Sequence, residues 1–90
     1  MISLHQQEHI KRMYAAQDDF RVLEIFWQDH FYATEGRFGY PVCVHLDNYA
    51  TQQTEDSLVL GYHVSREGCQ AQIDDIEAYI ATLKAEGAKA

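Results

Sequence analysis

The stretch Tyr40–Val64, YPVCVHLDNYATQQTEDSLVLGYHV, holds two alternating apolar segments separated by polar residues. In each segment every second residue is apolar, which is the period of a β-strand with one buried face. The stretch therefore predicts two strands of an antiparallel sheet. Pro41 is expected at the start of the first strand, where its missing N–H disturbs a ladder least. The alternating apolar positions are Val42, Val44 and Leu46, then Leu58, Leu60, Tyr62 and Val64.

A long polar loop, Asp47–Ser57, is expected to join the two strands. It is longer than a hairpin needs, and long loops held by rigid strands often carry binding residues. The alternative is a solvated excursion without a function. As a candidate contact surface the loop offers amides, an aromatic hydroxyl and two adjacent acids, on Asn48, Tyr49, Gln52, Gln53, Glu55 and Asp56.

The most regular pattern follows the second strand. Ser65 suits an N-cap and Gly87 suits the reversal that ends a helix, so we expect one long helix between them. Residues 86–90 are expected to form a frayed tail. An apolar stripe that would face the sheet recurs at alternating steps of four and three, at Cys69, Ile73, Ile76, Ile80 and Leu83.

The first residues predict another helix. Ser3 followed by Gln6 fits a capping box, in which each side chain bonds the other residue's backbone N–H. The helix is expected over about Leu4–Ala16. Its apolar stripe, which includes Ile10 and Met13, is narrow, so the helix should pack on one side only.

The segment between this helix and the quoted stretch fits two structures. As a helix from Asp19 to Ala33 it would be apolar over most of its circumference. As strands it places Leu23, Ile25 and Trp27 on one face, and its branched and aromatic residues suit a pleated sheet. We expect strands that break near 28–30, with a second turn at 35–36.

Together these elements predict a single α+β domain over residues 1–90. A small antiparallel sheet of three or four strands would be covered by an N-terminal and a C-terminal helix. In the alternative arrangement, two N-terminal helices precede a β-hairpin and the C-terminal helix. Ninety residues can build only one hydrophobic core.

The composition narrows the class of partner. Fourteen acidic against seven basic side chains give a formal charge of −7, which repels phosphate backbones and anionic lipids. We therefore expect no direct nucleic-acid binding and no membrane binding, and a basic protein as the partner. Two cysteines are too few for a disulfide scaffold, and no stretch resembles a signal peptide. These features predict a cytoplasmic chain with reduced thiols.

Two sets of residues could carry chemistry. Cys43, His45 and His63 would need a suitable register to meet, and a zinc site or an activated thiol needs further groups around them. His5 and His9 match the H-x-x-E-H pattern of some zinc proteases, but the chain has no room for a third-ligand helix and a peptide cleft. We expect no enzyme activity, no cofactor and no metal site.

The last helix carries a second acidic set, Glu67, Asp74, Asp75 and Glu77. Such a band could imitate part of a nucleic-acid backbone, by analogy with small acidic phage or plasmid inhibitor proteins. The sequence thus predicts a small acidic non-enzymatic binding protein that occludes or modulates a basic, nucleic-acid-handling protein partner. The alternative is a self-associating domain whose homodimer face is built from exposed aromatics, Trp27, Phe31, Tyr32, Phe38 and Tyr40.

Overall fold

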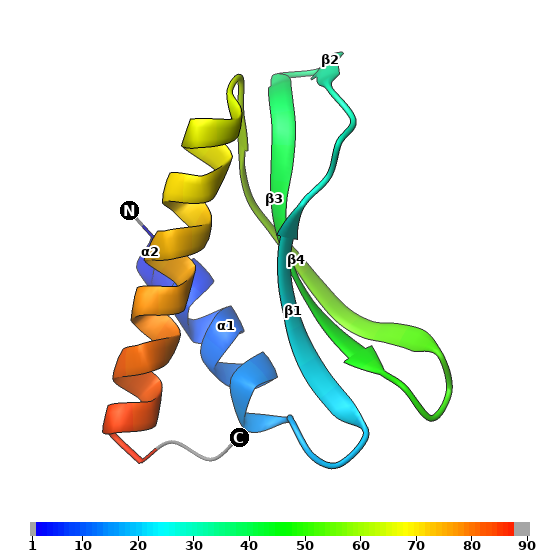
Figure 1. Ribbon diagram of the computed structural model, residues 1–90, viewed down its shortest axis with the longest axis vertical. Coiled ribbons are helices and arrows are strands. Elements are labelled where there is room, and N and C mark those ends of the chain that lie inside the picture. Colours follow the sequence, from blue (N-terminus) through cyan, green and yellow to red (C-terminus); the bar gives the residue numbers. More distant parts are fainter. Residues whose placement is uncertain (1, 88–90) are drawn as a thin grey trace.

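The computed structural model describes residues 2–87 and confirms the α+β class. Figure 1 shows both helices on the same side of one small sheet. The alternative with a second N-terminal helix is wrong, because the segment in question forms two strands. The elements are α1 (Leu4–Ala15), β1 (Arg21–Trp27), β2 (Tyr32–Thr34), β3 (Arg37–Asn48), β4 (Gln53–His63) and α2 (Arg66–Ala85).

β3 is the central strand of the antiparallel sheet. β4 pairs along one of its edges, while β1 and β2 follow each other along the other edge. Pro41 lies inside β3 and not at its start as predicted. Its carbonyl accepts the N–H of Gln28 at 2.9 Å, just where β1 ends. The missing N–H of Pro41 therefore faces the break between β1 and β2, where the ladder is interrupted.

The predicted break and turn in the first strands are both confirmed. β1 ends at Trp27 and β2 begins at Tyr32. A two-residue turn at Glu35 and Gly36 then leads into β3, with φ of +50° and +79°. Two consecutive positive φ angles are typical of tight hairpin turns, since their twist matches that of the strands.

The predicted long loop between β3 and β4 is wrong. β3 continues to Asn48 and β4 begins at Gln53, which leaves only residues 49–52 as the connection. The register shifts between Leu46 and Asp47, so that Glu55 is an extra residue in β4. This bulge interrupts the alternation of the strand, and it therefore hides the strand character of 53–57 from a pattern with a period of two.

Both helices begin as predicted. Ser3 and Gln6 form the capping box at the start of α1, with both bonds at 3.1 Å. Ser65 caps α2 by accepting the N–H of Gly68 at 3.1 Å. Gly87 adopts a φ of +76° as α2 ends. Of the predicted tail, residues 86 and 87 close the helix, and residues 88–90 lie outside the described part.

The core lies between the helices and one face of the sheet. β3 directs Val42, Val44 and Leu46 toward the helices, and the opposite face, which carries Cys43 and His45, has no helix over it. The predicted stripe of α2 is confirmed, since four of its five members are buried and Ile80 is half-buried. Each fully buried isoleucine or leucine of the stripe contributes about 1.5 to 3 kcal/mol. Across residues 2–87 there is no helix of the length and apolarity that crossing a bilayer requires.

Candidate functional site

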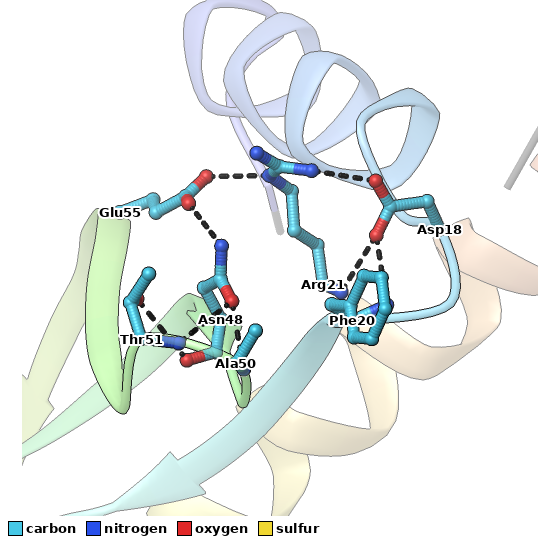
Figure 2. Close-up of polar contacts among 7 residues, drawn as sticks. All are labelled: Asp18, Phe20, Arg21, Asn48, Ala50, Thr51 and Glu55. Carbon is cyan, nitrogen blue, oxygen red and sulfur yellow. Dashed lines mark hydrogen bonds and ion pairs between the residues drawn. The ribbon is translucent and has the colours of Figure 1, made fainter.

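A polar corner joins the start of β1 to the turn between β3 and β4 (Figure 2). At its centre, Arg21 donates to Asp18 at 2.5 Å and to Glu55 at 2.7 Å. The carboxylate of Asp18 also accepts the backbone N–H groups of Phe20 and Arg21, at 2.9 and 2.8 Å. One guanidinium thus ties together acids that stand far apart in the sequence.

Asn48 completes the polar corner from β3. Its side-chain amide donates to Glu55 at 2.6 Å, and its oxygen accepts the N–H groups of Ala50 and Thr51 at 2.9 and 3.2 Å. The structure therefore brings two predicted contact residues, Asn48 and Glu55, together. Their polar groups hold the turn in shape, and Asn48 is buried.

The hydrogen bonds of the polar corner favour its charged state. The backbone N–H groups of Phe20 and Arg21 hold the pKa of Asp18 below its ordinary value. The Asn48 amide, followed by the Arg21 side chain, lowers the pKa of Glu55. Both acids consequently remain ionised to a lower pH than free carboxyl groups.

The other predicted residues of the hairpin are more accessible. Tyr49 is exposed and its hydroxyl donates to Glu24, which raises the pKa of Tyr49. Gln52, at a φ of +60°, and Gln53 are also exposed. Together with neighbouring side chains they line a shallow pocket of about 260 Å³ at the end of the hairpin. This pocket is a hollow of the predicted hairpin surface that a small ligand could enter.

Asp56 lies against α1. Its carboxylate contacts His9 of α1, with N–O distances of 3.0 and 3.1 Å. The H-x-x-E-H pattern of His5 and His9 did not predict this contact, because Asp56 lies 47 positions from His9 in the sequence. His9 and Asp56 thus link α1 to β4.

The acids of α2 form a separate surface. Glu67, Asp74, Asp75 and Glu77 are all exposed. Glu67 and Asp74 lie two turns apart on one side of the helix, about 10 Å along its axis. Asp74 accepts a hydrogen bond from Gln70 of the same helix at 2.9 Å. In Figure 1 the turn between β3 and β4 lies at the far corner from α2, so the two predicted acidic sets do not form one continuous surface.

Aromatic rings gather where β2 meets β3. On the helix side of the sheet, Tyr40 contacts Trp27 and Phe31 edge to face, with centroids 5.4 and 5.1 Å apart. Phe31 also contacts Phe38 at 5.0 Å, and Phe38 is 61% exposed. Tyr32 lies on the other face, against Tyr62. The predicted homodimer face is therefore divided between the two faces of the sheet.

The structure separates the residues of the possible thiol or metal site. Cys43 and His45 lie on the sheet face without helices, whereas His63 faces α2 and bonds Gln72 at 2.6 Å. Both cysteines are free and buried, and burial raises the pKa of Cys43 and of Cys69. A raised pKa lowers the fraction of reactive thiolate. Within residues 2–87, no three His, Cys, Asp or Glu side chains are placed to hold a metal ion together.

No family model matches this chain, and neither a curated protein nor a solved structure matches it either. The candidate surfaces therefore depend on the geometry described above. They are the exposed acids of α2 and the end of the hairpin with its shallow pocket.

Proposed function

We propose that this protein is a small acidic, non-enzymatic binding protein that occludes or modulates a basic, nucleic-acid-handling protein partner. The observation that carries the proposal is the exposed acidic side of α2. The helix is fixed to the sheet by its buried stripe, so Glu67 and Asp74 stand on a rigid support. A preformed acidic surface loses little conformational entropy when a partner binds.

The distribution of ion pairs adds to this support. Arg21 is engaged by two acids and Arg37 by Glu35, so these two cations neutralise charge at the sheet. With a formal charge of −7, the chain presents a negative field that speeds encounter with a positively charged groove. A protein that grips phosphates carries such a groove.

To test the proposal, the chain is immobilised on a support and incubated with host-cell lysate at low and at moderate salt. We expect the captured partner to be released by a short DNA duplex, because DNA competes for the same groove. The double variant Glu67→Lys/Asp74→Lys should capture at least about tenfold less, since each reversal places repulsive charges in the interface. The variant Asp19→Lys/Asp29→Lys changes the net charge equally at exposed sites elsewhere and serves as the control.

Two results would count against the proposal. Capture that is insensitive to salt and to DNA would show that the partner does not use a phosphate-binding groove. Equal losses in the two variants would show that only the total charge matters. In that case α2 would not be the contact surface.

A second candidate function is self-association, which is favoured by the exposure of Phe31 and Phe38 beside the turn at 35–36. Large exposed aromatic side chains commonly mark protein interfaces. Sedimentation equilibrium separates the two functions. A strict monomer at high concentration removes the second.

A further inference from the structure

The outer edge of β1 has a defined set of unpaired backbone groups. Gln28 donates its N–H to Pro41 of β3, which fixes the phase of the ladder between the two strands. In an antiparallel pair, residues alternate between bonding the neighbouring strand and pointing away from it. The backbone groups of Leu23, Ile25 and Trp27 therefore point to the outside of the sheet.

The first half of this edge is closed by the chain itself. Asp18 donates its N–H to the carbonyl of Arg21 at 3.1 Å. The side chain of Gln17 accepts the N–H of Leu23 at 3.0 Å. At Ile25, by contrast, neither the N–H nor the carbonyl has a hydrogen-bond partner anywhere in residues 2–87. Ile25 is thus the point at which another strand can pair.

An apolar cleft lies directly beside Ile25, between β1 and the two helices. Its volume is about 540 Å³. Clefts of this size accept several side chains of a bound segment. The cleft also explains why Ile80, alone in the stripe of α2, is only half-buried. Its apolar lining comes from Tyr14, Leu23, Ile25, Ile80 and Ala81.

The opposite edge of the sheet is less receptive. β4 is bent by two bulges. The side chain of Gln6 donates to the carbonyl of Leu60 at 3.1 Å, and the carboxylate of Asp56 accepts the N–H of Ser57 at 2.8 Å. Bulges and side chains on an edge strand are the means by which proteins block strand addition. An added strand would therefore pair with β1 more readily than with β4.

We propose that an extended segment of a partner protein adds to the sheet at Ile25, with apolar side chains entering the cleft and basic side chains alternating with them. Main-chain bonds to Ile25 would supply affinity, and the cleft would select alternate side chains. The basic side chains would lie beside exposed Glu24 on the other face, as an opposite-charge cross-strand pair. This inference rests on the proposed function and gives the basic partner a defined contact.

Charge decides between the possible occupants of the edge. The rim of the cleft carries Glu77 and Lys84, which offset each other. Glu24 and the overall charge of −7 then leave a net attraction for a basic segment. A second copy of this chain would bring another −7 to the same edge and be repelled. The structure thus favours a basic, alternating segment over a homodimer at β1.

A blocked seven-residue peptide of alternating lysine and valine provides the probe. In amide NMR spectra we expect its binding to shift Ile25 and to slow the hydrogen exchange of that N–H. The same peptide with N-methyl groups on its pairing amides should bind at least about tenfold more weakly, because the ladder cannot form. A peptide of alternating glutamate and valine should not bind detectably.

Protein variants test the cleft. Ala81→Arg places a large side chain at the opening of the cleft and should weaken binding of the lysine–valine peptide at least about tenfold. Ala71→Arg adds the same charge at an exposed position of α2 that does not line the cleft, and should leave affinity within about twofold. Glu24→Lys should weaken binding about threefold through loss of the cross-strand pair.

Four results would overturn the inference. The first is that the peptide shifts the amide signals of Ser57 and Val59 of β4. The second is that the N-methylated peptide binds as well as the unmodified one, and the third is that the two arginine variants bind the peptide with equal affinity. The fourth is a dimer that Ala81→Arg disperses, because it would assign the edge to a second copy of the chain. The edge inference can also fail while the proposed function stands. If Glu67→Lys/Asp74→Lys abolishes capture of the partner while Ala81→Arg leaves it unchanged, the edge inference falls and the proposed function stands.

Discussion

Gly39 of β3 pairs with Tyr32 of β2 and lies close to the backbone of His63 at the end of β4. Its φ is +122°, and a Cβ atom added to it would lie 2.4 Å from the carbonyl oxygen of His63. Gly36 also has a positive φ, of +79°, but a Cβ atom there would meet nothing within 4 Å. A substitution at Gly36 therefore measures the cost of a positive φ alone, whereas one at Gly39 adds a steric clash.

We predict that Gly39→Ala is more destabilising than Gly36→Ala. At Gly36 the cost is that of an unfavourable φ alone, about 1 kcal/mol. At Gly39 the new methyl group must also displace the backbone of β4, so we expect at least about 2 kcal/mol more. Urea denaturation followed by circular dichroism measures both values. Equal losses would show that the backbone of His63 yields without cost.

Single residues were predictable from the sequence where their partners are local. Ser3 meets Gln6 three positions away, and Ser65 meets Gly68, so the capping signals were visible in the sequence. Glu55 meets Arg21 from 34 positions away. No local pattern announces such a contact, so the sequence identified Glu55 as a polar residue without revealing that its charge is engaged by Arg21.

At the scale of the element, α2 combines a fully buried stripe with an acidic outer side. Ile76 is completely buried in the centre of that stripe. We predict that Ile76→Asp unfolds the protein, because a carboxylate without a partner would be placed in the core at a cost above about 4 kcal/mol. Ala78→Asp introduces the same group at an exposed position of α2 and should change stability by less than about 1 kcal/mol.

Circular dichroism at 25 °C and a melting curve of each variant check this prediction. An Ile76→Asp protein that kept the melting temperature of the wild type would contradict the placement of α2 on the sheet. Ala78→Asp controls for the effect of one more acid on an already negative helix.

The elements were predictable to different degrees. The stripe of α2 has a period that continues over its whole length, and its limits are marked by Ser65 and Gly87. β4 is different, because Glu55 is an extra residue that reverses the alternation in the middle of the strand. Because polar residues lie on both sides of this bulge, the sequence there has the pattern of a loop. A bulge depends on the partner strand, and a single sequence does not show it.

At the scale of the whole molecule, the two helices and one face of the sheet share a single core. We therefore predict one cooperative unfolding transition. Trp27, the only tryptophan, lies on β1 and reports on the sheet by fluorescence, while far-ultraviolet circular dichroism reports mainly on the helices. The two urea curves should coincide. A sheet signal that is lost before the helix signal would show two units that unfold separately.

The arrangement of the acids is also a property of the whole molecule. Asp18 and Glu55 meet around Arg21, whereas Asp74 is bonded within α2 to Gln70. The sequence predicted two acidic sets, but their separation follows from where α2 lies relative to the hairpin. That placement results from packing of the core, which composition and charge do not encode.

The bulged edge of β4 has a further consequence for assembly. A fibre of stacked sheets can lengthen only if every molecule offers two receptive sides, one to join its predecessor and one to receive its successor. Here β4 does not offer such a side, because its bulges bend it and the backbone groups of Ser57 and Leu60 are already bonded by side chains. A molecule that joined another through β1 would therefore not extend the assembly through β4, and growth by strand addition through these two edges would stop after a single step.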